Sequence, residues 1–185
     1  MSVSARFKDP AFVPFTQRVA SALVLREALY EYAANTPTAM AQAIAVVCFA
    51  GMAQPSTLTK EFAAWGMIAS MLLALFRWFM FATFIAYPTT RLLTWSRVEY
   101  KRLLRCLGFA EAPGLLNLFA WLSNEPLPEW TNVLIWLWLL AATIAALRAA
   151  LSLTYARATV IGIVIFLLYL GVGFVNALII ALPTP

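Results

Sequence analysis

The chain has 185 residues, of which 63% are hydrophobic and only 11% are charged. A soluble domain is usually about half apolar and a quarter charged, so this composition excludes an ordinary soluble core and predicts an all-α integral membrane protein. The net charge of +5 does not call for nucleic acid as a partner, because the basic residues are sorted by loop in the way that membrane topology requires.

The first 35 residues are expected to form a cytoplasmic segment, and residues 36–185 a single membrane domain. Residues 1–15 lack the continuous apolar core of a signal peptide, so no cleavage is expected. Between residues 16 and 35, apolar and charged residues alternate at helical spacing. This pattern predicts an amphipathic helix that lies at the membrane interface or docks on the protein's own spans.

Hydrophobic runs along the membrane domain predict five spans, separated by short polar or basic connectors. Thr36-Pro37 is a helix-start signal, and Pro88 ends the second run. The last run carries no charge and is long enough to cross ~30 Å of hydrocarbon at ~1.5 Å per residue. The expected spans are at about 37–53, 60–87, 108–122, 130–147 and 158–182.

The basic residues support this topology. Of the 13 Lys and Arg residues, Arg77 lies inside the second span and Lys60 on one side of the membrane, so the remaining 11 share the opposite side. By the positive-inside rule, the N-terminus is cytoplasmic and the C-terminus exoplasmic. The short loops and the alanine- and arginine-rich composition are typical of a prokaryotic protein, so a cytoplasmic (inner) membrane is expected.

The connector before the third span is basic and amphipathic. Its apolar residues recur at i, i+3, i+4 and i+7, from Tyr100 to Leu107, which predicts a helix in the cytoplasmic interface. Lys101, Arg102 and Arg105 are predicted to face lipid and hold anionic headgroups. The alternative is that these charges face water and only set the topology. Cys106, beside them, is a candidate for palmitoylation or a reactive thiol, although most such cysteines are packing residues.

Arg77 is the one basic residue expected within a span. A charge there costs at least ~2.5–3.5 kcal/mol unless it is paired or reaches the interface. Glu111, near the start of the third span, is the only acidic residue at comparable depth, so the two are predicted to form an intramembrane charge pair. Snorkelling of Arg77 alone, or a transport or lipid-headgroup site, are the alternatives.

Small and polar residues within the spans predict helix packing rather than ligand binding. Pro113 predicts a kink, Asn117 and Asn176 predict hydrogen bonds across helices, and Gly171 and Gly173 predict a close approach. Three tryptophans are expected at depth, where they pack between helices or face pigment, quinone, lipid or a partner: Trp78, Trp136 and Trp138.

The chain resembles the Yip family of small polytopic, Rab-interacting membrane proteins. The resemblance rests on Arg105-x-x-Gly108-Phe109-Ala110-x-x-Pro113, on Leu147-Arg148-x-x-Leu151 followed by Ala158, and on the opening LREALYEYAANTPTAMAQAIAVV. It implies a five-span helical domain with a cytoplasmic N-terminus. Eukaryotic members organise membranes for vesicle traffic and contact small GTPases, but this chain lacks their long cytoplasmic N-terminal domain.

The sequence offers no pair of nucleophile and base, no phosphate-binding loop and no cluster of carboxylates, so an enzyme is not expected. Histidine is absent and only Cys48 and Cys106 are present, so no metal or other cofactor is predicted. The expected function is a noncatalytic membrane protein that organises membrane or protein-complex assembly, with lipids, copies of itself or other membrane subunits as partners. The alternatives are an accessory subunit of a larger respiratory, photosynthetic or transport complex, and a small transporter or channel using Arg77 and Glu111.

Overall fold

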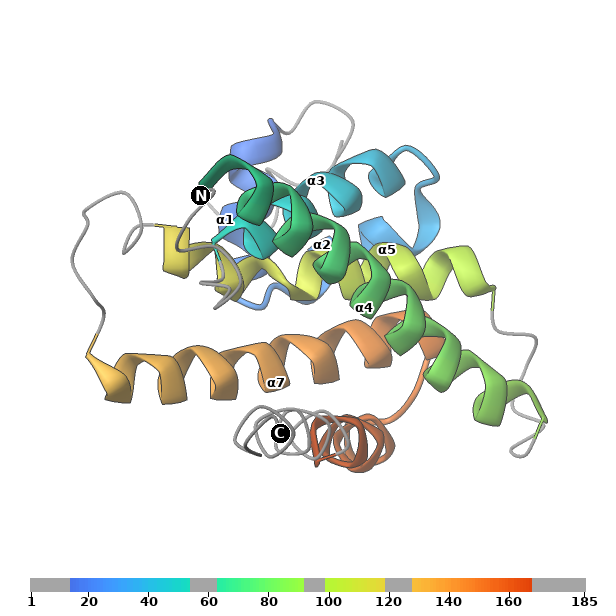
Figure 1. Cartoon of the computed structure of the whole chain (residues 1–185). Coiled ribbons are helices and arrows are strands. Elements are labelled where there is room, and N and C mark those ends of the chain that lie inside the picture. The colour runs from blue at the N-terminus through green and yellow to red at the C-terminus, as the bar shows by residue number, and fades with distance from the viewer. Residues whose placement is uncertain (1–13, 54–62, 92–98, 119–127, 168–185) are drawn as a thin grey trace, which may run out of the picture.

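The computed structural model describes residues 14–53, 63–91, 99–118 and 128–167, and all regular structure in these ranges is helical (Figure 1). This confirms the all-α class predicted from composition. In chain order the helices are α1 (Phe15–Leu23), α2 (Glu27–Asn35), α3 (Ala39–Met52), α4 (Ala63–Arg91), α5 (Tyr100–Ala110), the 3-10 helix η4 (Ala112–Leu115), α7 (Glu129–Leu151) and the helix Tyr155–Leu167. Two of the helices, α4 and α7, are long.

The N-terminal amphipathic segment forms two helices rather than one. The chain reverses between α1 and α2 at Leu25, whose φ of 55° lies in the left-handed region and therefore ends the first helix. The buried face of α2 includes Leu29 and Tyr30, and α2 packs against α5 and α7. Of the two expected positions for this segment, the structure shows docking on the protein's own helices.

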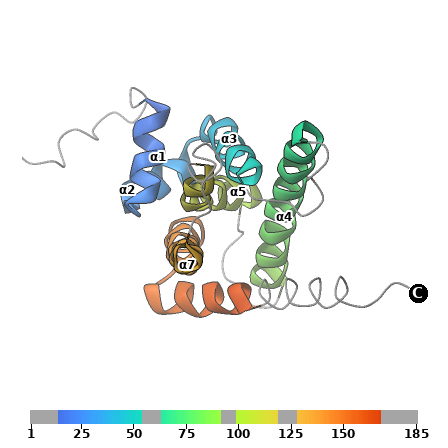
Figure 2. The ribbon, with the colours of Figure 1, turned by 60° about the vertical axis from the view of Figure 1, so that its left-hand side comes forward.

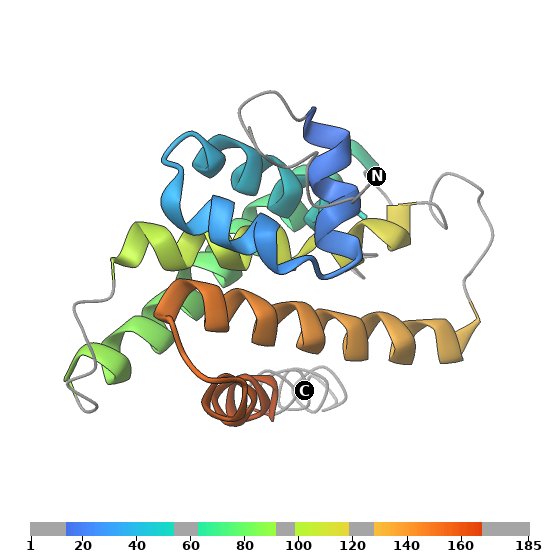
Figure 3. The ribbon, with the colours of Figure 1, turned by 180° about the vertical axis from the view of Figure 1, so that it is seen from behind.

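Helix α5 lies at the centre of the fold. It contacts α2, α3, α4 and α7, and the residues from Leu103 to Ala110 are all buried. Figures 1 and 3 show it between the group formed by α1, α2 and α3 and the long helix α7. The apolar stripe of this basic helix is therefore covered by the protein itself and not by lipid.

A close approach of α3 and α5 makes this central position possible. A Cβ added to Gly108 would lie 2.6 Å from the Cβ of Ala43, so only glycine lets the two backbones meet at this distance. In the sequence Gly108 is expected to begin the third span, but α5 passes through it without interruption. The chain then turns into η4 with Pro113 near its start, so the expected span at 108–122 does not begin as one continuous helix.

Two helices are long and apolar enough to cross a membrane. They are Trp65–Tyr87 within α4 and Trp130–Leu151 within α7, and only 28% of each is buried inside the protein. Helix α3 and the helix Tyr155–Leu167 are apolar but shorter. Helices α4 and α7 cross rather than run side by side, and the helix Tyr155–Leu167 crosses beneath α7 (Figure 2). The described residues thus support two spans by length and composition, and five are not shown.

Candidate functional site

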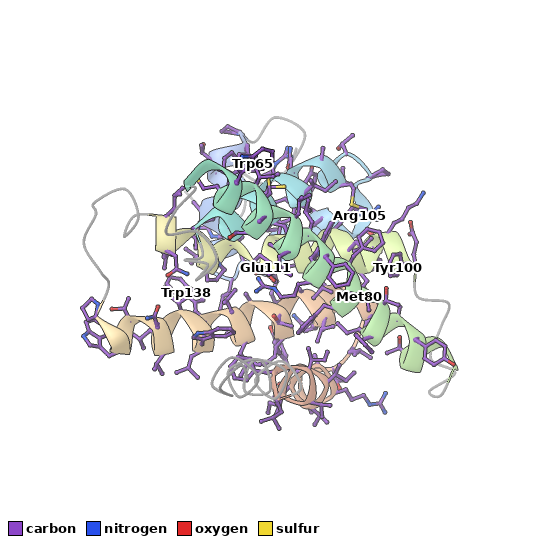
Figure 4. All side chains as sticks on the ribbon, in the orientation of Figure 1. Trp65, Met80, Tyr100, Arg105, Glu111 and Trp138 are labelled. Carbon is purple, nitrogen blue, oxygen red and sulfur yellow. The ribbon has the colours of Figure 1, made fainter. Side chains whose placement is uncertain are left out.

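A pocket holds the charged pair that the sequence singles out. Arg77 comes from the middle of α4, and Glu111 is the residue at which α5 ends and η4 begins. The Nη2 atom of Arg77 lies 3.6 Å from Oε2 of Glu111, and the two side chains are 22% and 25% exposed. Figure 4 shows Glu111 in the middle of the helical framework, between α5 and α7. The structure therefore brings together the two residues that were expected to pair.

Glu111 lies between two helix ends of opposite polarity. The C-terminal end of α5 carries partial negative charge and the N-terminal end of η4 partial positive charge, so the two act on its carboxylate in opposite directions. The guanidinium of Arg77 is the full charge that compensates the carboxylate. The N···O distance of 3.6 Å is longer than that of a direct N–H···O hydrogen bond. The two groups therefore form an ion pair without a short hydrogen bond between these two atoms.

The walls of the pocket are mostly apolar. They come from α4, α7 and the helix Tyr155–Leu167. The cavity volume of the pocket is about 60 Å³. Trp136 of α7 and Phe166 of the last helix form an edge-to-face aromatic pair with their ring centroids 6.1 Å apart. Beside Arg77 and Glu111, the lining residues are Phe81, Trp136, Leu139, Leu140, Thr143, Gly162, Ile165 and Phe166.

Gly162 sets the position of the last helix against α7. A Cβ at residue 162 would lie 2.7 Å from Cγ1 of Ile144, so a larger residue would push the two helices apart. The small residues of the sequence predicted that α7 and the last helix pack closely. That prediction placed the contact partly at Gly171 and Gly173. These two glycines and Asn176 lie outside the described residues. Asn117 is half-buried next to η4. The pocket depends on this close crossing because it brings Phe166 next to Trp136.

Arg105 does not face lipid, which corrects the sequence prediction. It is only 4% exposed, and its Nε and Nη2 atoms donate hydrogen bonds of 2.8 and 2.6 Å to the carbonyls of Ala33 and Ala34. These carbonyls lie in the last turn of α2, where helix carbonyls lack partners within the helix. Arg105 therefore caps α2 and joins it to α5.

The other two residues of the predicted basic site also separate. Arg102 is half-buried, and its Nη2 donates a 2.8 Å hydrogen bond to the carbonyl of Ala149 near the end of α7. Lys101 is exposed. Of the three side chains, two bind backbone carbonyls within the protein, so they do not form a common headgroup surface.

Arg148, part of the family-like motif, lies in a cluster that joins three helices. Its Nη1 is 2.6 Å from Oε2 of Glu27, and its guanidinium stacks 4.1 Å over the ring of Tyr155. The Tyr155 hydroxyl also bonds to Glu27. No local pattern predicts Glu27 or Tyr155 as partners, because Glu27 is far from Arg148 along the chain and Tyr155 lies across a turn. Phe109 and Pro113, also in the motif, are fully buried packing residues.

Two of the three deep tryptophans are anchored inside the protein. Trp78 Nε1 donates to the carbonyl of Leu104 at 3.2 Å, and Trp138 Nε1 donates to the carbonyl of Leu23 at 2.9 Å. Figure 4 labels Trp138. Only Trp136 lines the pocket. The polar edges of Trp78 and Trp138 are thus used to hold α5 and α1 in place, and this favours the helix-packing interpretation for them.

Cys106 is a buried packing residue. Its Sγ donates to the carbonyl of Tyr30 at 3.5 Å, and burial raises the pKa of the thiol to about 12. A thiol reacts as the thiolate and only where a reagent can reach it, so the complete burial of Cys106 favours the packing interpretation over palmitoylation. Within the described ranges, no group of three His, Cys, Asp or Glu side chains could hold a metal ion.

No family model, curated protein or solved structure matches the chain. The Yip-like resemblance therefore stays a prediction from the sequence.

Proposed function

We propose that this chain is a noncatalytic integral membrane protein that organises membrane or protein-complex assembly. The observation that supports it most is that only 28% of the most apolar stretch of each of the helices α4 and α7 is buried within the protein. The core helix of a soluble protein would be mostly covered. The described residues leave most of both helices open, and in this proposal lipid or another membrane helix covers them.

The exposed side chains are large and follow one another along both helices. Burying one of them completely is worth about 1.5–3 kcal/mol, so covering the exposed half of each returns roughly 1 kcal/mol. A row of such residues amounts to an energy comparable with the net stability of a whole domain. Those more than half exposed are Trp65, Leu72, Leu73, Phe76, Phe79, Phe84 and Tyr87 on α4, and Trp130, Val133, Leu134 and Leu137 on α7.

The finer topology belongs to the same proposal. It comprises five spans, a cytoplasmic N-terminus, an exoplasmic C-terminus and a prokaryotic inner membrane, and it is supported by the one-sided distribution of the basic residues. Membership of the Yip-like family is proposed on the motifs around Arg105 and Arg148. Reporter fusions at both termini test the topology, and finding both termini on one side would refute an odd number of spans.

An accessory subunit of a larger membrane complex is the second candidate, because the same open face of α4 suits a partner helix as well as lipid. Purification in mild detergent followed by native mass spectrometry separates the two. Monomers or self-oligomers with bound lipid support the organiser, and a stoichiometric foreign subunit supports the accessory role. Release of the chain from membranes by alkaline carbonate would refute both.

A further inference from the structure

We propose that the protein thins the lipid bilayer beside α3, because its apolar surface fits a thinner membrane there than beside α4 and α7. The inference rests on the proposed membrane function, in which α3 is one of the spans. It adds the form of the partner: a bilayer that is compressed on one side of the protein.

The long side of the apolar surface matches an ordinary bilayer. The apolar stretch of α4 from Trp65 to Tyr87 has 23 residues, or about 35 Å at ~1.5 Å per residue. Its two end residues are 70% and 67% exposed, and α7 likewise begins at an exposed Trp130. Tryptophan and tyrosine gather at membrane interfaces, because their rings are apolar and their polar edges reach the headgroups. Both helices can therefore cross a hydrocarbon core of ~30 Å with some tilt.

The short side is α3. It has only 14 residues, so it is about 21 Å long at ~1.5 Å per residue. Figures 1 and 3 show it lying nearly along the direction of α7. Its outward side chains are apolar, with Ile44 39% and Phe49 48% exposed. Beside this helix, about 9 Å of an ordinary hydrocarbon core would find no apolar helix surface.

Close backbone contacts hold α3 in place. A Cβ added to Gly51 would lie 2.5 Å from the Cβ of Ala74, so this half of α3 is fitted tightly against α4. The contact between Ala43 and Gly108 fits the other half against α5. Because both halves are held, α3 cannot slide along its neighbours, and tilting the helix would only reduce the height that it spans. The lipid therefore adapts to the protein.

The other ways of accommodating a short span do not fit α3. Flanking Lys or Arg side chains can snorkel to the interface, but no charged residue occurs from Thr36 to Ala53. The side chain of Gln42 is already held, since its Oε1 accepts a 2.6 Å hydrogen bond from Arg18. Oligomerisation needs a large interface, and only two large hydrophobic side chains of α3 are strongly exposed. Thinning of the bilayer remains.

A thinned rim gives the proposed organising function a physical means. Deforming a bilayer costs free energy, and membrane proteins are sorted by how well their spans match the local thickness. Other proteins with short spans would share the deformation beside α3, so they would gather there.

The depth of nitroxide labels tests the proposal. Cys48→Ala removes the partly exposed native cysteine, and the buried Cys106 stays. In this background, Thr38→Cys and Met52→Cys place labels at the two ends of α3, and Ile44→Cys places one near its middle. The protein is incorporated into dioleoylphosphatidylcholine vesicles, and electron paramagnetic resonance measures how accessible each label is to oxygen and to a water-soluble nickel chelate.

Phe76→Cys, in the middle of the exposed face of α4, is the matched reference. We expect its label at a depth of about 15 Å, the middle of an ordinary hydrocarbon core. Both end labels of α3 should lie at the headgroups, and the Ile44→Cys label no deeper than about 10 Å, half of the helix length. Phe49→Cys is a second position on the exposed face of α3, so the result does not depend on one variant.

Three results would overturn the proposal. Equal depth of the Ile44→Cys and Phe76→Cys labels would show one thickness on both sides of the protein. One shallow and one deep end would mean that α3 occupies a single leaflet. Two deep ends would mean that lipid of ordinary thickness, or a second copy of the chain, covers them.

The reference label separates this inference from the proposed function. If the Phe76→Cys label is not deep in the bilayer, the chain does not span the membrane as proposed and the function itself fails. If the Phe76→Cys label is deep and the α3 labels give one of the three contrary results, only the thinning fails.

Discussion

Replacing Arg105 with leucine should unfold α2 locally. The substitution removes two charge-assisted hydrogen bonds to the carbonyls of Ala33 and Ala34 and leaves both carbonyls buried without them. Hydrogen bonds to charged groups contribute about 1.5–3 kcal/mol each. Since leucine avoids the cost of burying a guanidinium, we expect a net loss of about 3 kcal/mol. At 1.4 kcal/mol per tenfold change, this corresponds to roughly hundredfold faster hydrogen exchange of the α2 amides.

The measurement is hydrogen–deuterium exchange with mass spectrometry in detergent, comparing α2 peptides with α7 peptides. Lys101→Leu is the control, because Lys101 is an exposed residue on the same helix and should change stability by less than about 0.5 kcal/mol. Unchanged exchange in α2 of the Arg105 variant would refute the capping role. An effect of equal size in the Lys101 variant would show that the charge of α5, rather than the two hydrogen bonds, stabilises this region.

Three further predictions concern packing, titration and the charge pair. Gly108→Ala should lower the free energy of unfolding by about 1–3 kcal/mol, because the new Cβ at residue 108 would lie 2.6 Å from the Cβ of Ala43. Adding Ala43→Gly should restore most of this loss, and denaturant titrations of the variants measure both effects. Cys106 should resist maleimide labelling up to about pH 10, and labelling of folded protein at neutral pH would contradict its burial. Because burial raises its pKa, its contribution to the free energy of unfolding should be complete below its ordinary pKa of 9.0 and lost as the pH rises towards 12. Arg77→Leu and Glu111→Leu should each reduce the folded yield, while the double variant recovers much of it; additive losses in this cycle would mean that the two charges do not interact.

The features predictable from the sequence are those set by periodicity and by the scarcity of charge. Long apolar runs predicted α4 and α7, and the isolation of Arg77 among apolar residues pointed to Glu111, because a charge in such a setting needs a partner. These inferences depend on residues near one another in sequence or on a very small set of candidates. They needed no knowledge of how the helices pack.

The place of α5 was not predictable in this way. Its apolar stripe and basic face are the pattern of an interfacial helix, and the same pattern serves a helix that buries one face and uses its arginines as caps. Arg105 and its two carbonyl partners are more than seventy residues apart, as are Cys106 and Tyr30. No local signal indicates that a basic residue will meet the end of a helix formed so much earlier in the chain.

The central position of α5 has a consequence for how the protein is made. Helix α5 ends at Ala110, and α7, which covers one of its sides, is complete only at Leu151. These 41 intervening residues take about 2–8 s to synthesise at 5–20 residues per second. For that time α5 has to wait beside the ribosome with α2 and α3 already available and α7 absent. A chain cut before α7 would therefore expose the most heavily buried helix of the protein, and such a fragment is the form that membrane quality control should recognise and degrade first.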